Sequence, residues 1–110
     1  MATVPATSTT RALSGPAGRA VAAHRDELRQ VFIRHGATNP RIFGSVARGD
    51  DRADSDVDVL VDLPSGFGLF ALGRLADELE RILGLRVDLV PESDLRPSVR
   101  AEVERDLVAL

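Results

Sequence analysis

Carboxylates recur on alternate residues in the short segment Asp56-Val57-Asp58-Val59-Leu60-Val61-Asp62. Because side chains alternate between the two faces of a β-strand, a strand at this position places the valines on one face and the aspartates on the other. The Cα atoms of Asp56 and Asp58 are then about 6.6 Å apart, which is two residues of strand rise. Both carboxylates can therefore reach a single hard cation or share a pair of cations.

An acidic edge strand kept for solubility is the alternative interpretation of this segment. Six aspartates lie between positions 50 and 62, and packing like charges together is unfavourable unless a cation neutralises them. A calcium-binding loop beginning at Asp54 fits poorly, because its sixth residue is Val59 where glycine is needed and its twelfth is Ser65 where glutamate is needed. The pattern favours a divalent cation held by strand carboxylates.

A Gly-Ser pair, Gly44-Ser45, precedes this strand and follows a short apolar segment. Glycine allows the chain to turn sharply and brings its backbone close to a ligand. A helical turn over residues 46–48 would point free N–H groups outward, and such a turn binds phosphate readily. Most Gly-Ser pairs are plain turns, so the carboxylates that follow give this pair its significance.

The elements that must position these residues follow from the spacing of the apolar side chains. We predict helices at residues 17–35, about 67–83 and within 92–110, and strands at 41–43, 56–62 and 85–90. Asp88 lies on the last of these strands, so it becomes a third candidate carboxylate if that strand pairs beside residues 56–62. The order of elements is that of one compact α/β unit.

The length of 110 residues suits one domain, which we place at residues 17–110 after a flexible tail at residues 1–16. A net charge of −3 argues against direct binding to nucleic acid. The chain has no cysteine, which excludes disulfides and thiolate metal sites. No apolar run is long enough to span a membrane, so we expect a cytoplasmic protein.

Two motifs together resemble a known family. The segment Phe43-Gly44-Ser45-Val46-Ala47-Arg48-Gly49, followed by Ser55-Asp56-x-Asp58, is similar to the signature of the minimal nucleotidyltransferase branch of the polymerase-β-like nucleotidyltransferase superfamily. The Val-Asp-Leu-Val segment around Asp88 extends the match, which covers about residues 20–110. The resemblance implies an α/β (α+β) fold with a small mixed sheet and helices packed on one face.

The resemblance also implies a metal site. In similar proteins the residues at Asp56 and Asp58 hold Mg²⁺ ions that bridge a nucleoside triphosphate. The residue at Asp88 ligates the metal ion at the acceptor hydroxyl and helps to deprotonate it. Two such ions would stabilise the attacking and leaving oxygens of an in-line displacement.

Four further residues are implied to bind ATP. Gly44 and Ser45 would hold the β and γ phosphates, and Arg48 or Arg52 could offset their charge. For the two arginines, solvation or pairing with a neighbouring aspartate is the ordinary alternative. The implied reaction transfers a nucleoside monophosphate to a hydroxyl and releases pyrophosphate.

Short members of this branch resemble the antitoxin half of a toxin–antitoxin pair whose other half is a helical HEPN ribonuclease. The implied function is transfer of AMP from ATP to a hydroxyl of that toxin. Two alternatives stay open: a binding module that neutralises the toxin by masking it, and a nucleotidyltransferase acting on a small hydroxylated molecule. The presence of all three aspartates, Asp56, Asp58 and Asp88, favours an enzyme.

Overall fold

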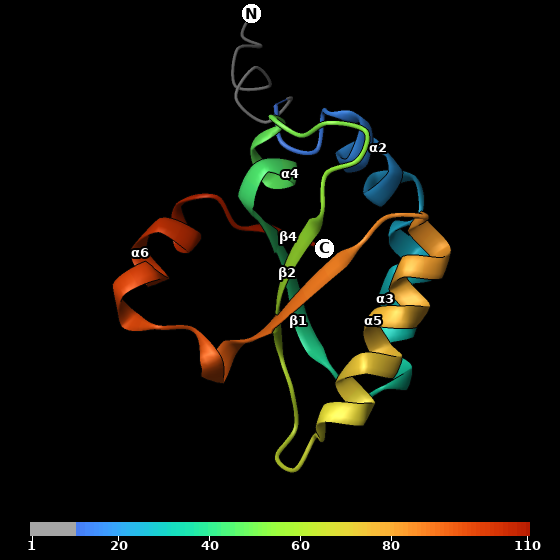
Figure 1. Ribbon diagram of the computed structural model, residues 1–110, viewed down its shortest axis with the longest axis vertical. Coiled ribbons are helices and arrows are strands. Elements are labelled where there is room, and N and C mark those ends of the chain that lie inside the picture. The colour runs from blue at the N-terminus through green and yellow to red at the C-terminus, as the bar shows by residue number, and fades with distance from the viewer. Residues whose placement is uncertain (1–10) are drawn as a thin grey trace, which may run out of the picture.

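A four-stranded mixed sheet with the strand order β3-β2-β1-β4 organises the computed structural model, which describes residues 11–110 (Figure 1). The strands are β1 (Thr38–Phe43), β2 (Val57–Asp62), β3 (Val87–Pro91) and β4 (Val108–Ala109). Strand β1 runs antiparallel to both β2 and β4, whereas β2 and β3 are parallel. The predicted fold class, a small mixed sheet with helices, is confirmed.

The helices are α2 (Pro16–Ala23), α3 (Arg25–Arg34), α4 (Gly44–Arg48), α5 (Leu69–Leu83) and α6 (Pro97–Arg105), with a 3₁₀ turn η1 (Glu92–Asp94). Helices α3 and α5 lie side by side on one side of the sheet, and α6 lies on the other (Figure 1). The expectation that the helices pack on one face therefore holds for α3 and α5 but not for α6. The valines of β2 are buried in the core with Leu75 and Leu79 of α5. The alternation predicted for β2 is therefore confirmed on its core face.

The prediction of one helix over residues 17–35 is wrong, because the chain breaks at His24 into α2 and α3. His24 has φ −109° and ψ 19°, outside the regular helical region. Neither glycine nor proline marks the break. It falls between the buried side chains of Val21 and Leu28, where no large apolar residue ties a continuous helix to the core.

The packed part of the chain begins earlier than predicted. Residues 1–10 of the expected tail lie outside the described residues. Residues 11–16 pack against the domain: Leu13 belongs to the hydrophobic core, and Pro16 starts α2. The boundary at residue 17 was misplaced because Leu13 is a single apolar residue among small and polar ones, without any periodic pattern.

The closing helix was predicted to continue to Leu110, but α6 ends at Arg105. Beyond it the chain forms β4, and the backbone N–H of Leu110 donates to the carbonyl of Pro40 at 3.0 Å. The residues after α6 therefore pair with the free edge of β1, although their apolar spacing also fits a helix. Leu110 is buried in the core.

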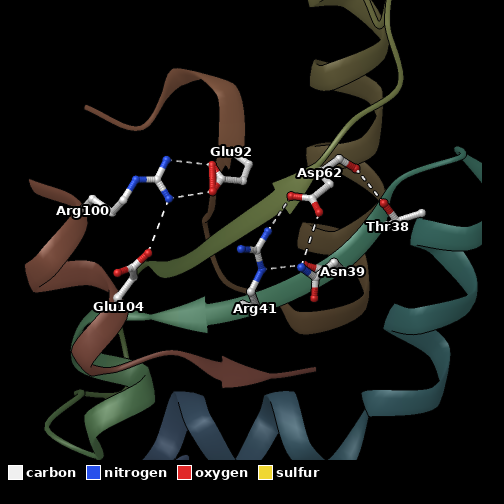
Figure 2. A network of polar contacts seen from close by, with 7 residues as sticks. All are labelled: Thr38, Asn39, Arg41, Asp62, Glu92, Arg100 and Glu104. Atoms are coloured by element: carbon white, nitrogen blue, oxygen red, sulfur yellow. Dashed lines mark hydrogen bonds and ion pairs between the residues drawn. The ribbon is translucent and has the colours of Figure 1, made fainter. Parts of the chain in front are cut away.

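The face of the sheet toward α6 carries charged side chains around a buried Leu60. Arg41 donates to Asp62 at 2.7 Å, and Arg100 of α6 donates to both carboxylate oxygens of Glu92, at 2.7 and 3.1 Å (Figure 2). Helix α6 contains no buried residue. Within residues 11–110, no helix has both the length and the apolarity needed to cross a membrane.

Candidate functional site

The three predicted carboxylates and the Gly44-Ser45 turn lie at one end of the sheet, where β1 ends and β2 and β3 begin. Phe43 pairs with Asp58 across the antiparallel β1–β2 ladder, and Asp58 pairs with Asp88 across the parallel β2–β3 ladder. Strand β1 runs directly into α4, which starts at Gly44. The condition set for Asp88, that its strand lies beside β2, is met.

Asp58 is the most electrostatically perturbed residue of this cluster. Burial, then the nearby charges of Asp88 and Asp56, raise the pKa of Asp58 to about 6, while the charge of Arg48 lowers it. The three carboxylates and this guanidinium therefore lie within electrostatic reach of one another. Their negative charge is only partly compensated by the protein.

Gly44 is required by the backbone at the start of α4. Its φ of +76° lies in the left-handed region, which other residues rarely adopt. A Cβ atom at this position would come within 2.5 Å of Oδ2 of Asp58. The glycine thus lets the turn approach this carboxylate, and the predicted contact of the turn with phosphate stays a prediction.

The donor chemistry of the cluster fits a divalent cation such as Mg²⁺, since carboxylate oxygens are the hard ligands it prefers. The side chains are not arranged as a complete metal site. Among residues 11–110, no group of three or more histidine, cysteine or acidic side chains is close enough together to hold a metal ion. Asp56 instead lies 4.0 Å from Nε of Arg86, and both are well exposed. The metal-ligand roles of Asp56, Asp58 and Asp88 stay a prediction.

The two arginines predicted to face phosphate differ in their surroundings. Arg48 contacts two carboxylates: its Nε donates to Asp50 and its Nη1 to Asp106, each at 3.1 Å. Arg52 is exposed in the loop, and its backbone N–H donates to the hydroxyl of Ser55 at 2.7 Å. Ser45, the second residue of α4, is half-buried. Of the two arginines, Arg48 is the one whose charge acts on Asp58.

Two residues that support the site were not predicted. Asp51 is buried, and its Oδ2 accepts hydrogen bonds from the backbone N–H groups of Ala17 at 2.7 Å and Gly18 at 3.1 Å. It therefore caps α2 from the loop before β2. Asp106 approaches Arg48 from the end of α6. Both contacts join residues more than thirty positions apart, so no local sequence signal could reveal them.

Comparison with known proteins places this geometry in a family. The nucleotidyltransferase domain model matches residues 24–110. The chain is 43% identical over 86 residues to protein adenylyltransferase MntA of Thermococcus cleftensis, covering 78% of this chain and 84% of that protein. It is 35% identical over 78 residues to a Methanocaldococcus jannaschii protein provisionally named a protein adenylyltransferase, covering 71% and 84%.

Two solved structures have the same fold. One, provisionally identified as a minimal nucleotidyltransferase, superposes with a TM-score of 0.74 at 43% identity and covers 84% of this chain and 94% of that one. The other, a toxin–antitoxin crystal structure with AMP-PNP, has a TM-score of 0.67 at 21% identity and covers 76% and 69%. The family model, the relatives and the sheet-end carboxylates agree: the chain belongs to the nucleotidyltransferase domain family and is a nucleotidyltransferase.

Proposed function

We propose that this nucleotidyltransferase transfers AMP from ATP to a hydroxyl of a partner protein. The observation that carries the proposal is the register of Asp58 and Asp88 on neighbouring parallel strands, beside the turn at Gly44. The names of two relatives support a protein acceptor: the Thermococcus protein is named a protein adenylyltransferase, and the Methanocaldococcus protein is provisionally named one.

The proposed chemistry assigns one task to each carboxylate. Asp56 and Asp58 would hold Mg²⁺, and Asp88 would lie on the acceptor side, where it would help to remove the hydroxyl proton. The hydroxyl oxygen forms a bond to the α-phosphorus as the bond from that phosphorus to the bridging β-phosphate oxygen breaks, and pyrophosphate leaves. Bound Mg²⁺ would offset the charge that develops on the attacking and leaving oxygens.

The triphosphate tail is proposed to lie along the Gly44-Ser45 turn. Backbone N–H groups and the Ser45 hydroxyl can donate to the β and γ phosphates, and Arg48 can offset their charge. Arg52, exposed in the neighbouring loop, is the second candidate for this role. Since the proposed donor is ATP, we place the reaction in the cytoplasm.

The proposed acceptor is a HEPN-type ribonuclease toxin, which makes this protein its antitoxin. A toxin–antitoxin structure that shares the fold supports this choice of partner class. Neutralisation by binding alone is the alternative, and a small hydroxylated acceptor is a further one. The three carboxylates favour catalysis, because a protein that only masks its partner has no need of them.

The test is a mass measurement on a HEPN-type ribonuclease toxin, the proposed partner. After incubation with Mg²⁺ and ATP, wild-type protein should add the mass of AMP to the toxin and remove its ribonuclease activity. The variant Asp56→Asn/Asp58→Asn should do neither. The control variant Asp26→Asn/Asp77→Asn removes the same charge at exposed residues of α3 and α5 and should act like the wild type.

Each alternative gives a different result. If the wild type and the Asp56→Asn/Asp58→Asn variant neutralise the toxin equally and neither adds mass to it, the protein acts by masking and catalysis is contradicted. An unmodified toxin, together with AMP on a small hydroxylated compound, would move the acceptor to that class.

A further inference from the structure

A chain of ion pairs crosses the surface beside the candidate site. Arg11 contacts Asp50 at 3.0 Å, Asp50 contacts Arg48 at 3.1 Å, and Arg48 contacts Asp106 at 3.1 Å. These contacts link the turn before α2, the end of α4 with the residues just after it, and the end of α6. Asp106 is the last member, and Arg48 is its ion-pair partner among the described residues.

The guanidinium of Arg48 binds carboxylates in this structure, whereas the proposed function assigns it to the phosphates of ATP. Its Nε and Nη1 groups both donate to aspartates. Hydrogen bonds to Asp106 and then Asp50 raise the pKa of the Arg48 guanidinium above its ordinary value. A guanidinium binds carboxylate and phosphate with the same N–H groups, so a polyphosphate must compete with these aspartates.

The Arg48–Asp106 pair also borders two surface depressions. One depression of about 260 Å³ is lined by Phe43, Gly44 and Val103, and another of about 360 Å³ by Arg11 and Asp50. Both are also lined by Arg48, Arg105 and Asp106. Small-molecule pockets usually measure about 300 to 1,000 Å³, and the depression beside Gly44 falls below that range while the pair is closed.

We propose that Asp106 restrains Arg48 in the nucleotide-free protein and competes with the polyphosphate of ATP for it. The proposal rests on the function proposed above, with ATP as donor, and it makes Asp106 a positioning residue that acts through Arg48. Asp50 is the weaker candidate for this role because Arg11 shares its charge. Release of Arg48 from Asp106 joins the two depressions and frees the end of α6.

The experiment measures the dissociation constant of Mg²⁺–ATP by isothermal titration calorimetry. Asp106→Asn should lower it about three- to fivefold, the effect expected when a partly exposed ion pair no longer competes. Asp106→Glu keeps the carboxylate and should restore the wild-type value. Glu104→Gln, two residues before Asp106 and paired with Arg100, removes the same charge and should change the constant by less than about 1.5-fold.

A double-variant comparison shows whether the effect passes through Arg48. In an Arg48→Gln background, Asp106→Asn should leave the dissociation constant unchanged, because the restrained group is gone. The same gain in both backgrounds, or equal binding by wild type and Asp106→Asn, would overturn the inference alone. Absence of Mg²⁺–ATP binding in all variants would overturn the proposed function and, with it, this competition. Thermal unfolding of each variant checks that it is folded.

Discussion

Asp58 is the residue where function and stability oppose each other. Its pKa is raised to about 6 from an ordinary value of 3.8, first by burial and then by Asp88 and Asp56. The folded protein therefore binds more protons than the unfolded chain between these two values, and stability falls as pH rises through that window. Without metal, the ionised Asp58 destabilises the fold at neutral pH.

Asp58→Asn should accordingly stabilise the metal-free protein. We expect a gain of about 2 kcal/mol near about pH 8, which shrinks below about pH 6 and vanishes near about pH 4 as Asp58 of the wild type becomes protonated. Urea unfolding in EDTA across this pH range measures the difference. Asp54→Asn is the control, and a gain that did not depend on pH would contradict an origin in the ionisation of Asp58.

Gly44 should tolerate no side chain, for two reasons. Alanine would have to adopt a φ of +76°, and its Cβ would meet Oδ2 of Asp58 at 2.5 Å. We expect Gly44→Ala to cost about 1 to 3 kcal/mol in the free energy of unfolding. The matched control is Gly73→Ala in α5, where a Cβ meets nothing within 4 Å and helix propensity should add about 0.5 to 1 kcal/mol. Denaturant unfolding should show that the free energy of unfolding falls in Gly44→Ala and rises in Gly73→Ala.

At the scale of elements, the loop before β2 and the start of α2 depend on each other. Asp51→Ala should cost about 1 to 2 kcal/mol, because the N–H groups of Ala17 and Gly18 lose their acceptor. Hydrogen exchange should locate the effect at these amides. Asp54→Ala, in the same loop but exposed, should leave their exchange unchanged, and equal effects of the two variants would argue against capping.

The elements differ in how far the sequence alone could predict them. Strand β2 and helix α5 were predictable from their apolar residues, which the core buries. These residues alternate along β2 and recur every three to four positions along α5. The break at His24 was not, because no residue type marks it. Strand β4 was not either, since Leu107 and Leu110 also fit a helix and only the free edge of β1 decides between the two.

In the candidate site, too, the features that are local in sequence were predictable and those that depend on tertiary packing were not. The Gly-Ser turn and the Asp56-x-Asp58 spacing are local patterns, so the sequence could identify them. The position of Asp88 depended on the order of strands in the sheet, and the contacts of Asp51 and Asp106 depend on tertiary packing. Such contacts produce no recognisable pattern in the sequence, because the two partners lie far apart along the chain.

For the whole molecule, the site is assembled from segments that meet only in the folded state. Asp58 and Asp88 come from two strands, Gly44 from the end of a third, and Arg48 is held by the end of α6. A ligand that bridges these segments binds the folded chain and has little affinity for the unfolded one. Binding of Mg²⁺ and ATP should therefore stabilise the entire fold.

The size of that stabilisation follows from the ligand concentration. At about one hundred times the dissociation constant, Mg²⁺–ATP should add about 2.7 kcal/mol, which raises Tm by roughly 10 °C or more in a domain of this size. Thermal unfolding with ATP in EDTA is the control, and its Tm should rise far less. An unchanged Tm at millimolar Mg²⁺ and ATP would contradict the site.

The Asp56→Asn/Asp58→Asn variant makes this last prediction specific to the carboxylates. Because it lacks the repulsion around Asp58, it should melt above the wild type when neither protein has ligand. It should gain nothing from Mg²⁺–ATP, so the order of the two melting temperatures reverses at saturation. A variant that gained as much as the wild type would show that the nucleotide binds elsewhere. The reversal follows because the charges that destabilise the empty fold are the ones proposed to bind the cation.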